Sequence, residues 1–427
     1  MKKNTFFNVL LIIFFLIGIG LIAYGTSIII FKENKIEKKY DSSKNAKDYS
    51  SSQDIFNFNN TLIKTINKNE NGNYLISPYS IEVALNMLKE GSNSTTYNEL
   101  NKILPSNKIA NLNIKNRISV ANAVFVKSMY QDNIKKDFIS TVKNKYNSEI
   151  LFVEFNPPDV INDWVKKKTF GMLDKLIDEV NPDFVMGLAN ALAIDVEWKY
   201  KFKCVNTIKS NFTVLDSTKE VEMMHNSYES NQKDVKYIKN DNEIAVILPY
   251  NSYNKEDSET DTVDLQFIAV LPNNDVNKYI YDFNLEKYSS LMNGFKDIGP
   301  NEKLDVSLPR FKYDYSINNF NKYLINIGLR ETFSENPNFS RIIDKNLKIS
   351  SSVHKTHISL NEKGTKAAAV TYFSMANSSA LDEKTIINID FNKPFLYMIK
   401  DSKSDELLFF GVVKEPNEWK GSDCKIE

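Results

Sequence analysis

The chain has 427 residues, of which 42% are hydrophobic and 12% aromatic, a length and composition that suit one large or a few ordinary globular domains. Lysine plus arginine and aspartate plus glutamate both total 54, so there is no basic excess for nucleic acid and no acidic excess for a cationic partner. The two cysteines, Cys204 and Cys424, exclude a disulfide-dense scaffold and a cysteine-cluster metal site, and the sequence leaves open whether they pair.

An uncharged apolar stretch of 26 residues, Phe6 to Phe31, opens the chain and is long enough to cross a bilayer. We expect an uncleaved signal-anchor over residues 1–31, because the apolar run continues beyond Ala23-Tyr24-Gly25, the small-residue site at which a signal peptide would be cut. Cleavage there would make the protein secreted. The lysine count after the stretch exceeds that before it, which favours the unusual orientation. A large domain behind a very short N-terminal tail favours the extracellular side, and we expect that placement.

Residues 32–53 are rich in Lys, Asp and Ser without apolar periodicity, which predicts a flexible polar tether. A helical stripe starts at Ile55, and Tyr74 to Ile76 predicts a short strand. Ser80 is the predicted N-cap of the next helix, which Gly91 closes.

Further strands are expected in the middle of the chain at Ser119 to Val126 and Ile150 to Phe155, with a helix between them that ends near Tyr146. A helix containing Trp164 follows Pro157-Pro158, and Leu188 to Val196 is another apolar run. Two buried strands, 244–250 and 263–274, flank an acidic loop from Asn254 to Thr262.

The last third is dominated by strands, expected around Leu304 to Phe311, Ile386 to Ile389, Phe395 to Ile399 and Leu407 to Val413. Helices early, strands late and the lack of an internal repeat predict an α+β domain with large mixed sheets.

The stretch Asn361 to Ser379 carries two conflicting signals. Read with period two from Thr365, one face is small or apolar and could enter a core as a strand. Gly364 at its start and the polar run Asn377 to Ser379 at its end are typical of an exposed loop. The pattern indicates a segment that can be either.

Several motifs in shared order resemble the serpin family from about Asp54 to Pro416: ISPYSIEVALNML, VANAVFV, INDWVKKKTFGMLDKLI, ANALAIDVEWKYKF, SLPRF, NEKGTKAAAVT, FNKPFLYMI and LFFGVVKEP. The resemblance implies a serpin domain over 54–416, a C-terminal tail over 417–427, three β-sheets, eight or nine helices and an exposed reactive-centre loop. It implies a monomer without cofactors that inhibits a serine or cysteine protease. The loop is cut as a substrate and inserts into the central sheet while the acyl-enzyme is intact.

The resemblance also assigns roles to individual residues. The hinge of the loop would be Glu362, Gly364, Thr365, Ala367, Ala368, Ala369 and Thr371. The polar shutter of the central sheet would be Ser77, Ser80, Asn190 and His354. The breach, where insertion starts, would be Trp198, Arg310 and Glu362, and an arginine–carboxylate pair is reasonable there.

Counting seventeen residues from Glu362, as the family does, puts the reactive bond between Ser378 and Ser379. The loop is several residues longer than in typical members, so Asn377, Ser379 or Leu381 stay open as cut sites. A small residue there favours elastase-like or subtilisin-like proteases. Lys384 would suit a trypsin-like enzyme but lies too far downstream for timely insertion.

Two other functions compete with inhibition. A hydrolase is disfavoured because no Gly-x-Ser-x-Gly elbow occurs, and a zinc enzyme because His354 and His357 have no further ligand of a recognised pattern. We therefore expect no catalytic residue and no metal site. A non-inhibitory member acting as a binding or chaperone-like protein is the real alternative.

The abundance of Lys, Asn and Ile suggests an AT-rich prokaryotic genome.

Overall fold

The structure is a computed structural model that describes residues 46–105, 110–179, 184–214, 217–255, 258, 260–350, 352–365 and 384–417. Residues Met1–Ser52 and Gln53–Glu427 form separate units, and the fold below is that of the second. No helix among the described residues is long and apolar enough to span a membrane, and the predicted anchor lies outside those residues.

The largest sheet is a seven-stranded antiparallel sheet in the order β1-β20-β19-β12-β9-β8-β13. Its strands are β1 (Tyr74–Ile76), β8 (Lys236–Lys239), β9 (Glu243–Pro249), β12 (Leu265–Pro272), β13 (Lys296–Asp297), β19 (Phe395–Asp401) and β20 (Leu407–Val413). Every residue of β19 and β20 is buried, because continuous apolar runs suit strands covered on both faces.

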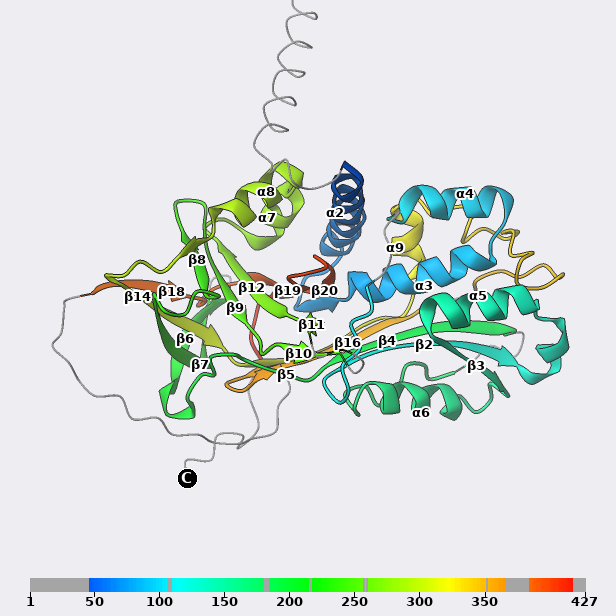
Figure 1. The fold of residues 1–427 in the computed structure, drawn as a ribbon, viewed down its shortest axis with the longest axis horizontal. Helices are drawn as coiled ribbons and strands as arrows, with labels where there is room; N and C mark the ends of the chain where they lie inside the picture. Colours follow the sequence, from blue (N-terminus) through cyan, green and yellow to red (C-terminus); the bar gives the residue numbers. More distant parts are fainter. Residues whose placement is uncertain are drawn as a thin grey trace, which may run out of the picture. The chain divides into compact units, whose positions relative to one another are not determined.

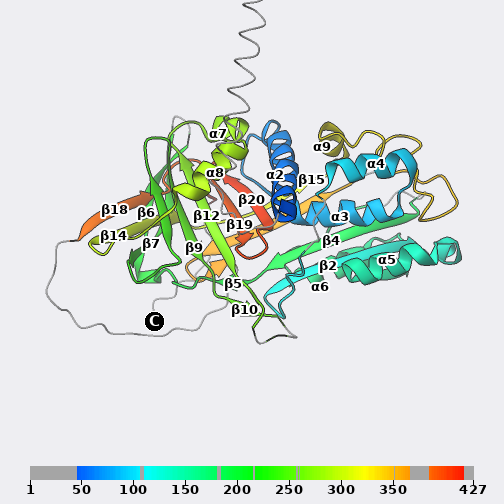
Figure 2. The same ribbon diagram turned by 45° about the horizontal axis from the view of Figure 1, so that its top comes forward.

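A second sheet has the order β18-β14-β7-β6, with β14 and β18 parallel and the other pairs antiparallel. Its strands are β6 (Thr207–Val214), β7 (Ser217–Glu229), β14 (Glu302–Pro309) and β18 (Thr385–Asp390). Figure 2 shows this sheet at the opposite end of the domain from α5 (Lys136–Tyr146) and α6 (Asp159–Lys168).

Two further sheets are consecutive along the chain. One has the order β3-β2-β4, and the other has the order β15-β16-β17-β5. Their strands are β2 (Ile118–Lys127), β3 (Ser148–Val153), β4 (Met186–Ile194), β5 (Val196–Glu197), β15 (Phe311–Ile317), β16 (His354–Asn361) and β17 (Gly364–Thr365). Only Asp195 separates β4 from β5, so the chain runs directly from one of these sheets into the other. A small hairpin of β10 (Tyr253–Asn254) and β11 (Thr262–Val263) stands apart.

The remaining helices are α2 (Ala46–Asn67), α3 (Pro78–Gly91), α4 (Ser94–Ile103), α7 (Val276–Asp282), α8 (Leu285–Gly294) and α9 (Asn321–Asn326), with short 3₁₀ turns at Ser128–Asn133 and Cys204–Asn206. In Figure 1, α3 and α5 lie on one side of β2 and β4, and α6 lies on the other. Trp164 of α6 meets the ring of Phe125 in β2 edge-on at 5.6 Å between centroids. The predicted α+β fold is confirmed, and the described strands form five hydrogen-bonded sheets.

Three local predictions need correction or completion. The N-cap of α3 is Ser77, not Ser80: Pro78 occupies the first helical position, and the Ser77 hydroxyl accepts the amide of Ser80 at 3.1 Å. The ends of the predicted acidic loop are paired, since Asn254 lies opposite Thr262 in the β10–β11 hairpin. Cys204 is disulfide-bonded, and Cys424 lies outside the described residues.

Candidate functional site: the entry point of the central sheet

Gly364 and Thr365 of the predicted hinge already lie inside a sheet. Strand β17 pairs with β16 on one side and with β5 on the other, with Gly364 opposite Glu197 and Thr365 opposite Val196. The amide of Trp198 also donates to the carbonyl of Lys363 at 2.8 Å. We call this place, where β17 lies between β5 and β16, the entry point.

Glycine is required at the entry point. Gly364 has φ of +152°, a conformation that L side chains rarely adopt, and a Cβ there would lie 2.1 Å from the carbonyl oxygen of Val196. A larger residue would therefore push β5 away from β17.

Thr365 faces the interior and is only 4% exposed. Its hydroxyl shares a hydrogen bond of 2.7 Å with the phenol of Tyr250, and burial raises the pKa of Tyr250 well above its ordinary value. The ring of Tyr250 stacks on that of Trp198 at 4.5 Å, and the Trp198 indole N–H donates to the carbonyl of Asn361 at 2.9 Å. The hinge thus enters the core against two aromatic rings.

The predicted breach pair is formed beside this aromatic stack. Arg310 Nε donates to Glu362 Oε1 at 2.6 Å, and Arg310 Nη1 contacts Glu222 Oε2 at 2.5 Å. Arg310 and Glu362 are almost fully buried, and the hydroxyl of Thr207 also donates to Glu362. Glu362 Oε1 therefore accepts from both Arg310 and Thr207, and such added hydrogen bonds help to offset the cost of burying an ion pair.

A narrow cavity of about 10 Å³, room for about one water molecule, continues from Thr365 down the sheet. Its walls include Leu192 to Ile194 of β4 and His357 to Ser359 of β16. Among the residues the structure describes, no ladder of hydrogen bonds joins β4 to β16. The two strands therefore face each other across the path that a longer inserted strand would take.

Two of the predicted shutter residues, Asn190 and His354, lie on β4 and β16, and the other two, Ser77 and Ser80, lie at the start of α3. The backbone amide of Ser77 donates to His354 Nε2 at 3.2 Å, which requires that nitrogen to be unprotonated. Burial lowers the pKa of His354 to about 4, so the ring is neutral at pH 7. Ser80 lies next to both through its contact with Ser77. Asn190 instead donates to Asn122 Oδ1 in β2 at 2.7 Å, across the β2–β4 ladder.

His357 has a different environment from His354, although both are on β16. Its Nδ1 lies 2.6 Å from Asp314 Oδ1 of β15, on the other side of the strand from the buried His354. The His-x-x-His spacing therefore turns the two rings to opposite faces, since residues three apart alternate across a strand.

The other predicted hinge and reactive-bond residues lie outside the described residues: Ala367, Ala368, Ala369, Thr371, Asn377, Ser378, Ser379 and Leu381.

Sequence reasoning missed Tyr250, Glu222 and Thr207, which complete the entry point. Tyr250 ends a predicted buried strand, and that position was the one available signal, since a polar-tipped aromatic at a strand end commonly finds a partner.

Comparisons with known proteins agree with this architecture. The family model described as serpin (serine protease inhibitor) matches residues 53–416. An uncharacterised serpin-like protein of Thermococcus kodakarensis is 28% identical over 89% of this chain and 89% of its own length. A leukocyte elastase inhibitor of Xenopus tropicalis is 28% identical over 84% of this chain and 97% of its own length.

Solved structures show the same fold. The thermophilic serpin tengpin in its native state superposes with a TM-score of 0.69 at 28% identity, covering 88% of this chain and 96% of tengpin. Tengpin in its latent state gives 0.68 at 26% identity, covering 88% of this chain and all of that structure. A family match over most of the chain, together with these relatives, shows that this protein belongs to the serpin family.

Proposed function

We propose that this protein is a suicide-substrate inhibitor of proteases, which traps its target as an acyl-enzyme by inserting its cut loop between β4 and β16. The observation that carries the proposal is the seating of Gly364 and Thr365 between β5 and β16. The segment that follows in sequence starts at the top of the path between the two facing strands.

The energetics of insertion favour such a mechanism. About a dozen residues would gain ladder hydrogen bonds of roughly 0.5–1.5 kcal/mol each and bury one face, a gain on the order of 10 kcal/mol or more. This gain is comparable with the stability of an ordinary protease domain, about 5–15 kcal/mol. Small residues at the alternate positions Thr365, Ala367, Ala369 and Thr371 keep the steric barrier to insertion low.

The proposed targets are elastase-like or subtilisin-like serine proteases. A reactive bond at Ser378–Ser379 presents a small side chain, which suits a shallow primary pocket. One relative bears the name leukocyte elastase inhibitor, which supports the same class.

The test is to mix residues 53–427 with elastase-like, subtilisin-like and trypsin-like proteases and to look for a covalent complex by denaturing electrophoresis. We expect a detergent-resistant band with at least one elastase-like or subtilisin-like enzyme. Mass spectrometry of the released fragment then identifies the cut bond. If every protease cuts the loop and leaves active, the protein is a substrate, and the non-inhibitory alternative takes its place.

We also propose that residues 6–31 anchor the protein in a prokaryotic cell membrane with the serpin domain outside. The proposal rests on the length of the uncharged stretch and on its continuation past the small-residue site. Membrane fractionation and protease treatment of intact cells test it. Recovery of a shortened chain in the medium would instead indicate a cleaved signal peptide.

A further inference from the structure

Strand β5 is held on both of its edges. On one edge, Val196 and Trp198 face the hinge through Thr365 and Lys363. On the other edge, the amide of Glu197 donates to the phenol oxygen of Tyr253 at 3.0 Å, and its carbonyl accepts the amide of Asn251 at 2.8 Å. Because alternate residues of a strand point their backbone groups to opposite edges, neither contact competes with the other.

The second edge of β5 needs these hydrogen bonds because β2, which pairs with β4, does not extend alongside β5. The β2–β4 ladder begins at Ile118, opposite Ile194, and beyond it Arg117 contacts Asp195, whose amide donates to the Arg117 carbonyl at 2.7 Å and whose carbonyl accepts from Arg117 Nη1 at 3.4 Å. Arg117 lies over the ring of Tyr253 at 5.5 Å and 3.6 Å from the carboxylate of Glu197. Tyr253 thus stands where a longer β2 would have stood.

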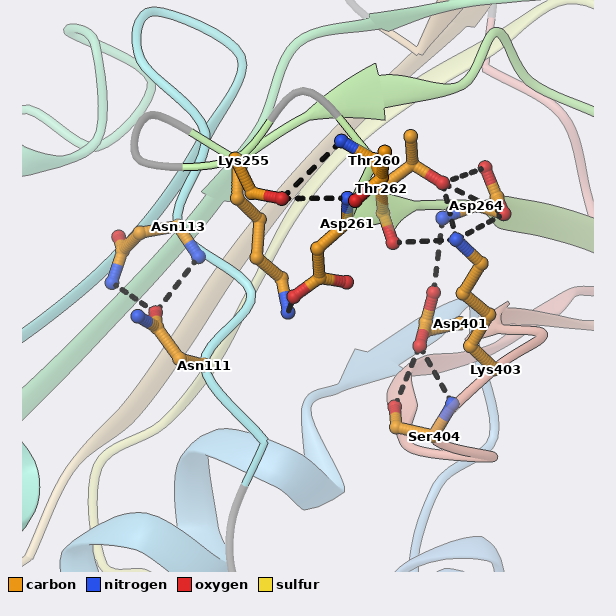
Figure 3. Close-up of polar contacts among 11 residues, drawn as sticks. Asn111, Asn113, Lys255, Thr260, Asp261, Thr262, Asp264, Asp401, Lys403 and Ser404 are labelled. Carbon is orange, nitrogen blue, oxygen red and sulfur yellow. Dashed lines mark hydrogen bonds and ion pairs between the residues drawn. The ribbon is translucent and has the colours of Figure 1, made fainter.

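The strand opposite Tyr253 is fixed to the seven-stranded sheet: Tyr253 pairs with Val263, and the residues on either side of Val263 contact β19 and the turn that follows it, as Figure 3 shows. Lys403, in the turn between β19 and β20, contacts Asp264 Oδ2 at 3.0 Å and donates to the carbonyl of Thr262 at 3.1 Å. The amide of Asp264 donates to Asp401 Oδ1 at 3.0 Å. Within the hairpin, Lys255 pairs with Asp261 at 2.9 Å. A chain of hydrogen bonds and ion pairs therefore connects the β19–β20 turn to β5.

We propose that the β10–β11 hairpin is a brace that holds β5 one strand-width away from β16, and that the Tyr253 hydroxyl is its positioning group. The inference rests on the proposed inhibitory function and adds a determinant of its rate. Insertion of a strand requires the two strands on either side of it to separate. At the entry point, the brace already holds β5 and β16 apart. If β5 were released, it could close towards β16 and displace Thr365, and the loop would then have to reopen the sheet before it could insert.

Tyr253→Phe tests the brace, because it removes the hydroxyl and keeps the ring beneath Arg117. The readout is the rate at which the protein takes up a synthetic peptide with the sequence of residues 366–377, followed by native electrophoresis. Loss of one hydrogen bond at the entry point should slow uptake by about two- to tenfold. The control is Tyr281→Phe, at a ring that is 70% exposed on α7, which should leave the rate unchanged.

The outcomes separate the brace from the proposed function. If the wild-type protein takes up the peptide and Tyr253→Phe does so equally fast or faster, the brace is wrong while the inhibitory function stands. If the wild type neither takes up the peptide nor forms a covalent complex, both proposals fail. An equal slowing in Tyr281→Phe would also overturn the brace, because it would show a general effect of removing a hydroxyl. The urea midpoint of each variant, measured in parallel, separates a loss of stability from a loss of positioning.

Discussion

At the scale of single residues, the buried titratable groups determine how the stability of the fold depends on pH. His354 accepts the Ser77 amide as a neutral ring, and burial lowers its pKa from 6.5 to about 4. Between these values the unfolded chain binds a proton that the folded protein does not. The stability contributed by the neutral ring is therefore complete above pH 6.5 and is lost as the pH falls towards 4.

We predict that His354→Gln, whose carbonyl can still accept the Ser77 amide, loses less stability on acidification than the wild type. The pKa shift of His354 corresponds to a change of about 3 kcal/mol in the free energy of unfolding between pH 7 and pH 4. Urea unfolding at both pH values measures it. All other titrating groups are shared, so the difference between the two proteins isolates His354. Parallel pH profiles would show that the ring is not buried as described.

The effect of pH on stability has the opposite sign at Glu82. It lies buried in α3, and one carboxyl oxygen has no hydrogen-bond partner. Burial, reinforced by the nearby Glu406, raises its pKa from 4.5 to about 8. The folded state keeps a proton that the unfolded chain releases, so stability is greatest below pH 4.5 and falls as the pH rises to 8.

We predict that Glu82→Gln loses less unfolding free energy than the wild type as the pH rises from 5 to 8. The difference should be on the order of 3 kcal/mol. Thermal unfolding at several pH values checks the trend, and Glu286→Gln, at an exposed position in the first turn of α8, is the control. An unchanged pH dependence would contradict the buried, protonated carboxyl.

At the scale of elements, the proposed insertion depends on the two-residue strand β17, which the rest of the loop would extend. Thr365 occupies a buried position beside Tyr250, where a charged side chain would have no partner. We predict that Thr365→Arg converts the inhibitor into a substrate: its target cuts the loop at a similar rate, but no covalent complex accumulates.

Lys363→Arg is the matched control for Thr365→Arg, since it places the same side chain two residues earlier at a half-buried position. It should retain complex formation. Equal amounts of complex from Thr365→Arg and the wild type would mean that this face does not enter the sheet. The ratio of complex to cut loop on a denaturing gel gives the measurement.

At the scale of the whole molecule, the described structure pairs β4 only with β2, and β16 only with β15 and β17. The native fold therefore leaves ladder hydrogen bonds unmade that an inserted strand would supply. We predict that a cut in the loop by a protease that is not trapped raises the melting temperature by more than 10 °C, because about a dozen new hydrogen bonds form. Differential scanning calorimetry before and after the cut measures it. An unchanged melting temperature would rule out insertion.

The sequence by itself determined the order of helices and strands, the apolar cores of β12, β19 and β20, and the two-faced character of the segment after Gly364. Periodicity is a local property, and continuous apolar runs report burial directly. Family motifs added Arg310, Glu362, Trp198 and His354, and the structure brings the first two into contact.

Only the tertiary structure decided which groups meet across long sequence separations. Tyr250 reaches Thr365 over 115 residues, and Tyr253 reaches Glu197 over 56, and neither pairing leaves a periodic trace in the sequence. The N-cap at Ser77 was missed for a similar reason: two serines three residues apart offer the same hydroxyl, and only the backbone path around Pro78 selects between them. The entry point and its brace depend on hydrogen bonds between strand edges that are distant in sequence. Every buried strand edge needs such partners, but the sequence alone does not show which group supplies them.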